Sequence, residues 1–191
     1  FRKIIDEYHD RAMAAEAWIL PLSKMAKWVR EDEYHQAFNF EYLATQWEAT
    51  RLKDVVDESL REFGAVGAPS TWVLSNHDVI RHVTRLSYEE IPKQGDGIGP
   101  DYPQPDEAKG LRIGRAASAF MLGLPGSSYL YQGEELGLPE HTTLEAKHRQ
   151  DPTFFRTKGE RVGRDGCRVP IPWEADSPAF GFSQTGKSWL P

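Results

Sequence analysis

Cysteine is almost absent from this sequence: Cys167 is the one thiol among 191 residues. A single thiol excludes a disulfide within the chain and favours a reducing compartment, so we expect a cytoplasmic location. Long apolar runs are absent too, because no stretch approaches the roughly 18 residues that a membrane-spanning helix needs. The sequence therefore predicts no membrane partner.

An excess of basic charge is the third absence. The 23 lysines and arginines are outnumbered by 29 aspartates and glutamates, which gives a net charge of −6. Nucleic-acid phosphates need a basic field, so nucleic acid is not expected as a partner. One basic cluster does occur at residues 156–168, where acidic residues interrupt it. Its mixed charge favours a solvated loop with one or two arginines that face a substrate.

The most informative feature present is Asn76-His77-Asp78, which ends the apolar run Trp72-Val73-Leu74. An apolar run that stops at polar groups is typical of a buried strand that delivers them to a pocket. Two other interpretations stay open. Asn or Asp after a strand often caps the next helix, and a His/Asp pair can bind a metal. No third ligand stands at a matching spacing, so the metal interpretation is the less favoured of the two.

Strand and helix patterns alternate along the chain, which specifies a parallel sheet with outer helices. The apolar and aromatic runs predict strands at residues 37–40, 70–75 and 128–131. Helical periodicity and propensity predict helices at residues 21–31, 45–64 and 107–122. Residues 13–18 are ambiguous, because propensity alone favours helix in this alanine-rich stretch.

Local signals set the bounds of the first two helices. The first has one apolar face, formed by Leu22, Met25, Ala26 and Val29. In the second, Thr45 and Glu48 have the spacing of a capping box, and Gly64 ends the helix. Its apolar positions recur at helical period, at Leu52, Val55, Val56, Leu60 and Phe63.

Glycine and proline mark the remaining segments. Gly110 and Gly114 would let the helix at 107–122 lie close to a sheet. Residues 92–106 have no periodicity, which predicts a loop. The glycines within this loop resemble a phosphate cradle, but no Gly-Lys-Ser/Thr follows, so the loop interpretation is favoured. From about residue 138 onward, the proline-rich chain predicts a long irregular tail.

Four segments, in family order, resemble motifs of the α-amylase family, glycoside hydrolase family 13. The likeness is to bacterial α-glucosidases and oligo-1,6-glucosidases. The segments are Ala15-Glu16-Ala17-Trp18, Ser75-Asn76-His77-Asp78-Val79-Ile80-Arg81, Tyr131-Gln132-Gly133-Glu134-Glu135 and Arg164-Asp165-Gly166-Cys167-Arg168. The resemblance implies that residues 1–191 are the C-terminal half, strands five to eight, of an α/β (β/α)8 TIM barrel. It also makes residues 13–18 a strand.

The resemblance assigns roles to four residues. Glu16 would be the general acid, although an Ala-flanked Glu is by itself typical of a solvated helix. Asp78 would stabilise the oxocarbenium-like transition state and grip sugar hydroxyls. His77 and Arg81 would bind the same sugar. The strand ends at which these residues stand are where barrel enzymes place their chemistry.

Other residues of these segments have alternative interpretations. Trp18 would form either an apolar wall of the site or part of the core. Glu134 and Glu135 are explained by a strand-to-helix turn, although one could shape the rim of the site. No metal and no cofactor are implied, because the family's calcium site lies upstream.

The family's nucleophile segment is missing from this sequence, and the chain begins at Phe1. We therefore expect part of a retaining glycosidase that acts on small α-glucosides, inactive as an isolated piece. Two alternatives stay open: a non-catalytic carbohydrate-binding or structural fragment, and a transglycosylase or isomerase of the same family. Unprotected edge strands further predict self-association or docking to the missing half barrel.

Overall fold

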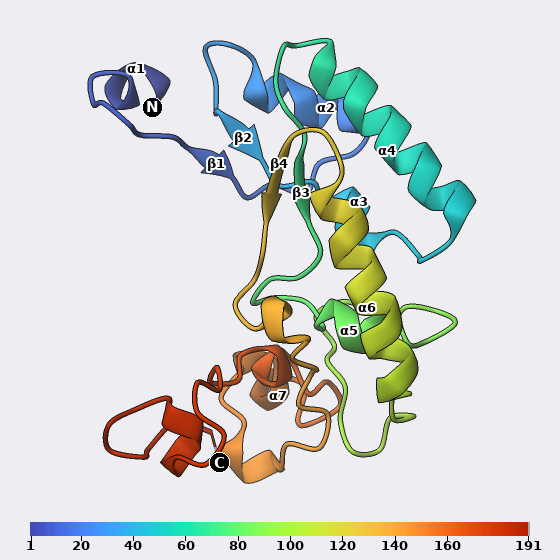
Figure 1. Cartoon of the computed structure of the whole chain (residues 1–191), viewed down its shortest axis with the longest axis vertical. Helices are drawn as coiled ribbons and strands as arrows, with labels where there is room; N and C mark the ends of the chain where they lie inside the picture. Colours follow the sequence, from blue (N-terminus) through green and yellow to red (C-terminus); the bar gives the residue numbers. More distant parts are fainter. Residues whose placement is uncertain (191) are drawn as a thin grey trace. The chain divides into compact units, whose positions relative to one another are not determined.

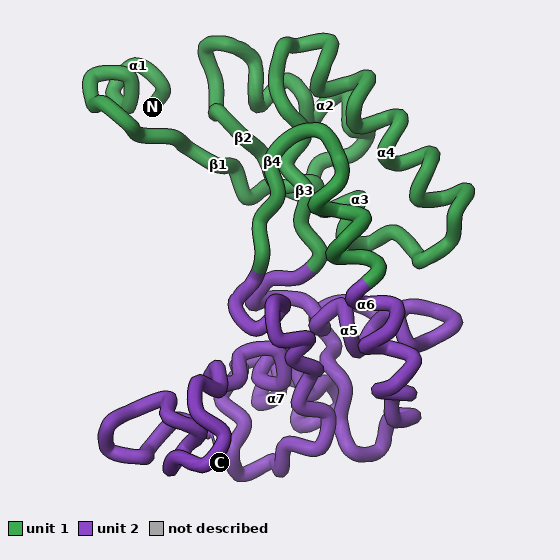
Figure 2. Tube along the Cα trace, viewed as in Figure 1, with its two compact units in different colours: residues 1–74, 116–130 green, residues 75–115, 131–191 purple. Residues whose placement is uncertain are grey.

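The computed structural model describes residues 1–190 of the chain. The chain divides into two compact units (Figure 2). Unit 1 contains residues 1–74 and 116–130, and unit 2 contains residues 75–115 together with the chain from 131 onward. No helix of the described residues is long and apolar enough to cross a membrane.

All strands of the described residues lie in unit 1, and they pair in parallel (Figure 1). β1 (Ala14–Ala15) pairs with β2 (Gln36–Ala37), and β3 (Thr71–Val73) pairs with β4 (Ser127–Tyr129). A parallel bridge from Phe38 to Thr71 links the two ladders, so the strands neighbour one another in chain order. The predicted parallel pairing is confirmed, and β1 confirms a strand within residues 13–18. Each strand is shorter than predicted.

The helices of unit 1 bury most of the apolar positions that periodicity predicted, although Leu60 is 37% exposed. α2 (Leu22–Met25) continues as the 3-10 helix η1 (Ala26–Val29), and both lie beside α4 (Ala49–Gly64) in Figure 1. The buried residues of α2 and η1 form one cluster with side chains of β1, β2 and α4; its members are Ala15, Leu22, Met25, Ala26, Val29, Ala37 and Phe63. Burial of this apolar surface stabilises the unit. A short helix, α1 (Arg2–Ile5), opens the chain and buries none of its residues.

The predicted capping box is wrong. The Thr45 hydroxyl donates to the Glu41 carbonyl at 2.8 Å, and Thr45 ends a helix, α3 (Phe40–Ala44), that the sequence did not predict. Asn39 begins α3 by accepting a hydrogen bond from the Tyr42 amide at 3.0 Å. Glu48 precedes α4 without a side-chain cap bond. Ser, Thr and Asn occur both at helix starts and in turns, so the sequence did not show that Asn39 begins one helix and that Thr45 ends it.

Unit 2 has short helices and long irregular segments. Its elements are α5 (His82–Arg85), the first part of α6 (Glu107–Leu122), η2 (Glu134–Leu136), η3 (Ala146–His148), α7 (Pro152–Arg156), η4 (Asp165–Cys167) and η5 (Pro178–Gly181). The bounds of α6 match the predicted helix. Residues 92–106 contain no helix or strand, as predicted, and α6 begins directly after them. The tail from about residue 138 is mostly irregular and is interrupted by the short helices η3, α7, η4 and η5.

The glycines of α6 contact a helix. A Cβ on Gly110 would lie 2.2 Å from the Val83 carbonyl oxygen, and one on Gly114 would lie 2.8 Å from a Val83 methyl group. Both glycines therefore let α6 pack closely on α5. The prediction that they approach a sheet is wrong, because the sequence showed small residues but could not show which element they contact.

Candidate active site

Asp78 lies in a turn that follows β3. The Asn76 side-chain oxygen accepts a hydrogen bond from the Asp78 amide at 2.7 Å, which closes the turn. The next helix, α5, begins at His82 with Arg81 at its N-cap position and no side-chain cap bond. Neither Asn76 nor Asp78 caps this helix, so the capping interpretation of the segment is wrong.

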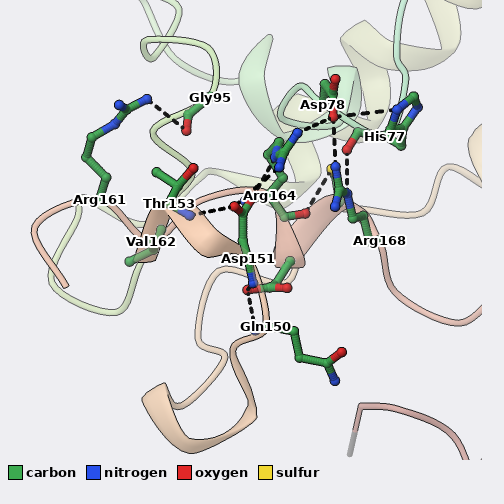
Figure 3. A network of polar contacts seen from close by, with 12 residues as sticks. His77, Asp78, Gly95, Gln150, Asp151, Thr153, Arg161, Val162, Arg164 and Arg168 are labelled. Atoms are coloured by element: carbon green, nitrogen blue, oxygen red, sulfur yellow. Dashed lines mark hydrogen bonds and ion pairs between the residues drawn. The ribbon is translucent and has the colours of Figure 1, made fainter. Parts of the chain in front are cut away.

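The Asp78 carboxylate is held through one of its two oxygens (Figure 3). Oδ1 accepts from Arg164 Nη1 at 2.8 Å and from Arg168 Nη2 at 2.7 Å. His77 Nε2 lies 3.6 Å from the same oxygen. Within the described part of unit 2, every hydrogen bond and ion pair of this carboxylate reaches Oδ1. Oδ2 is left for another partner, while the side chain stays 37% exposed.

The charges around Asp78 keep it ionised. Partial burial raises its pKa, but His77 and the guanidinium groups of Arg164 and Arg168 outweigh this effect. The pKa of Asp78 therefore lies below its ordinary value. A carboxylate that is anionic at neutral pH and keeps one oxygen open can bind a hydroxyl group or stabilise a nearby positive charge.

Arg164 is itself anchored by a buried carboxylate. Its Nε donates to Asp151 Oδ2 at 2.6 Å, its backbone amide to the same oxygen at 2.8 Å, and its Nη2 to Oδ1 at 3.3 Å. The Asp151 side chain is fully buried. Burial raises the pKa of Asp151, but the hydrogen bonds from Arg164 and from Thr153 lower it by more. The pKa of the Arg164 guanidinium is raised, first by its hydrogen bond to Asp151.

The second arginine, Arg168, is fixed by the backbone. Its Nε donates to the His77 carbonyl oxygen at 2.7 Å, so it contacts both His77 and Asp78 (Figure 3). The segment that looked like a solvated loop is thus partly an ordered support for Asp78. Sequence reasoning missed the part played by Arg164 and Asp151. The one available signal was the resemblance of the Arg164-Asp165 pair to a family motif, and a motif does not show which residues its side chains contact.

Arg81 is buried within unit 2. Its side chain is 1% exposed, and it donates to the carbonyl oxygens of Gln132 and Cys167, each at 2.9 Å. The guanidinium carbon also lies 4.7 Å from the centre of the Tyr131 ring. These contacts tie the turn after β3 to two later segments. They give Arg81 a structural role, and its predicted contact with a substrate stays a prediction.

A second polar cluster is formed by Ser75, His82 and Glu134. His82 Nδ1 is 3.1 Å from the Ser75 hydroxyl and 3.7 Å from a Glu134 carboxylate oxygen. Burial lowers the pKa of His82 to about 3 and raises that of Glu134 to about 7. His82 is therefore neutral at pH 7. Both side chains are at most 2% exposed, so a substrate cannot reach them.

The neighbouring Glu135 is exposed and has a local role. Its carboxylate accepts a hydrogen bond from the Gly133 amide at 2.8 Å. This contact and the 3-10 helix η2 account for both glutamates as parts of a turn. The turn interpretation of Glu134 and Glu135 is confirmed.

Glu16, the predicted acid, lies in unit 1 directly after β1 and is exposed. Trp18 is 50% exposed, and its ring centre lies 5.8 Å from that of Phe40. Half of the Trp18 surface is thus available, which argues against a core role. The carboxyl end of β1 therefore carries an accessible acid followed by an accessible aromatic ring.

Parallel strands joined through helices, with polar side chains after β1 and β3, define an α/β fold. The family model of the α-amylase catalytic domain matches residues 1–191. The chain belongs to this family, and the family and its solved structures imply a TIM-barrel fold.

Individual proteins that resemble this chain have names that agree with this family. A probable α-glucosidase of Rhizobium meliloti is 37% identical over 84% of this chain and 25% of its own length. An oligo-1,6-glucosidase of Saccharomyces cerevisiae is 23% identical over 84% of this chain and 30% of its own length. In the crystal structure of the α-glucosyl transfer enzyme XgtA, the matching region is 31% identical in sequence, with a TM-score of 0.78. The match covers 100% of this chain and 31% of the XgtA chain. The chain thus spans about a quarter to a third of the length of these relatives.

Proposed function

We propose that this chain is the second half, strands five to eight, of the catalytic barrel of a retaining glycosidase. The substrate class is small α-glucosides and oligosaccharides. The observation that carries the proposal is the Asp78 carboxylate, which is ionised, 37% exposed and held through one oxygen after a parallel strand. Family membership and relatives with glucosidase names support the same class.

In this mechanism, Glu16 protonates the departing glycosidic oxygen and later activates water. Asp78 Oδ2 accepts hydroxyl hydrogen bonds from the sugar and stabilises the positive charge that develops on its ring. His77, which is 57% exposed, donates to the same sugar. The covalent nucleophile belongs to the first half of the barrel. This division predicts that residues 1–191 alone do not form a glycosyl-enzyme intermediate.

Arg81 enters the proposal with a changed role. Its buried contacts with Gln132 and Cys167 support positioning of the turn that carries Asp78. Direct substrate binding by Arg81 would need its guanidinium to leave these two carbonyl groups. We therefore assign the charged contact near Asp78 to the network of Arg164 and Arg168.

Transfer of glucose to an acceptor other than water is the second candidate. The likeness to an α-glucosyl transfer enzyme favours it. The same acid and the same stabilising carboxylate serve both reactions, so the fate of the glucosyl group must be measured. No metal or cofactor is part of either scheme, and a cytoplasmic location and docking to the first half of the barrel stay predictions.

The test uses the full-length protein with maltose, isomaltose, sucrose, trehalose and a nitrophenyl α-glucoside. Glucose release and transfer products are quantified in the same reactions. Glu16→Gln and Asp78→Asn should each lower kcat/KM by about 100-fold or more, because one loses the proton donor and the other the stabilising charge. The exposed Glu31→Gln is the matched control and should retain activity.

Two results would count against the proposal. A folded full-length protein without activity on any of these sugars would remove the enzymatic function and favour carbohydrate binding. Activity that survives Glu16→Gln would show that another group is the acid. A crystal structure with a bound sugar tests separately whether the Glu16 and Asp78 carboxylates face one cleft.

A further inference from the structure

The way in which Asp78 is held suggests a role for two residues that lie far along the chain. Arg164 and Arg168 both donate to Oδ1, and neither reaches Oδ2. A carboxylate that was merely ion-paired on a surface would be free to rotate and to share both oxygens. Here one oxygen is committed to the protein, and the other is directed elsewhere.

Arg164 is the better fixed of the two arginines. Asp151 accepts three of its N–H groups, at Nε, Nη2 and the backbone amide, with the shortest distance 2.6 Å. The remaining terminal nitrogen, Nη1, is the one that reaches Asp78 at 2.8 Å. The planar guanidinium thus serves two carboxylates at once, which a lysine cannot do because its ammonium is a single point charge.

Asp151 is fixed in turn. Its Oδ1 accepts from the Thr153 amide at 2.8 Å, while its backbone amide donates to Asp165 at 3.1 Å. A buried anion with this many donors is strongly ordered, and within the described part of unit 2 its ion-pair partner is Arg164. Asp151 therefore fixes the orientation of Arg164, and Arg164 in turn fixes the orientation of Asp78 (Figure 3).

We propose that Asp151 and Arg164 are positioning residues that hold Asp78 Oδ1, so that Oδ2 alone faces the substrate. The inference rests on the proposed function, because it assigns Asp78 to transition-state stabilisation. Arg164 does not touch the sugar in this scheme. Loss of the bridge leaves Asp78 present but free to turn, and its charge is less well directed at the reacting carbon.

The first experiment compares kinetics of the full-length protein. Arg164→Lys keeps the positive charge but cannot bridge both carboxylates, so kcat should fall by about 10- to 100-fold while KM changes by less than about threefold. Asp151→Asn should act in the same direction with a smaller loss. Arg161→Lys is the control. Arg161 lies on the same segment as Arg164, but its ion pair is with Asp96 and not with Asp78, so the change should leave both parameters unchanged.

The second experiment does not depend on turnover. In protein labelled with 13C at the aspartate carboxyl groups, the Asp78 signal is assigned by its loss in Asp78→Asn and then titrated. Arg164→Met should raise the titration midpoint of Asp78 by about one pH unit, because one of its guanidinium partners is removed. Arg161→Met should leave the midpoint unchanged.

The outcomes distinguish failure of the proposed function from failure of the positioning role. An inactive wild-type protein in which Arg164→Met still moves the Asp78 midpoint would reject the proposed function and keep the positioning role. An active wild type with unchanged kcat in Arg164→Lys and an unmoved midpoint in Arg164→Met would overturn the positioning role alone. If Arg164→Met does not fold, kinetics and titration of Arg164→Lys decide.

Discussion

The two units bury different kinds of side chain. Among the described residues, no Asp, Glu, Lys or Arg is buried in unit 1, whose core is apolar around Trp72 and Leu43. Unit 2 buries seven such residues: Arg81, Arg85, Glu134, Glu140, Arg149, Asp151 and Asp165. An apolar core follows from periodicity and volume, whereas each buried charge needs a particular partner. The difference predicts that unit 1 responds to lost volume and unit 2 to lost or altered charge.

The largest effect should come from removing volume in unit 1. Trp72 is 0% exposed; its ring centre is 5.1 Å from that of Tyr42, and its indole N–H donates to the Pro125 carbonyl at 2.8 Å. Trp72→Ala should lower the free energy of unfolding by about 3–5 kcal/mol through lost burial and the cavity left behind. Urea denaturation of the full-length protein measures this loss. Leu60→Ala, at a position 37% exposed, is the control and should cost less.

A pH-dependent effect should mark unit 2. Glu140 accepts a hydrogen bond from the Arg81 amide at 3.0 Å, and burial raises its pKa from 4.5 to about 7. The folded state therefore binds more protons than the unfolded state between these values. Stability from the neutral acid is present below pH 4.5 and is lost as the pH rises through 7.

Glu140→Gln tests this expectation, because the amide stays neutral and can still accept from Arg81. Its stability relative to the wild type should rise between pH 4.5 and 7, by on the order of 2–3 kcal/mol in total. Thermal unfolding at several pH values measures the difference. The exposed Glu160→Gln is the control. A difference that does not vary with pH would mean that Glu140 is charged throughout.

The smallest effect concerns Asn39, one of the buried polar but uncharged residues of unit 1. Asn39 is 0% exposed, accepts from the Tyr42 amide and donates to the Ser59 hydroxyl at 2.7 Å. Asn39→Ala should lower the free energy of unfolding by about 1–2 kcal/mol, as for other lost N-caps. A loss as large as that of Trp72→Ala, in the same denaturation assay, would show that unit 1 also depends on polar contacts and would weaken the comparison.

The sequence was sufficient where a signal repeats within one element. Leu22, Met25 and Val29 recur at helical period, and the structure buries all three. The helix at 107–122 has its predicted bounds, and the apolar run that ends at Asp78 is a parallel strand followed by a turn. Motifs in family order also placed the chain in its family, because each motif is short and local.

Tertiary structure alone decided what depends on residues far apart in the chain. One local choice also needed the folded structure: Thr45 ends one helix and does not begin the next, because the Glu41 carbonyl, four positions earlier, is available to its hydroxyl. Gly110 meets Val83, and Asp151 meets Arg164, which in turn reaches Asp78 from 86 positions away. Propensity and spacing describe neighbours along the chain. The partner of a buried charge is fixed by where the folded backbone brings it, and that is why the support of Asp78 became visible only in three dimensions.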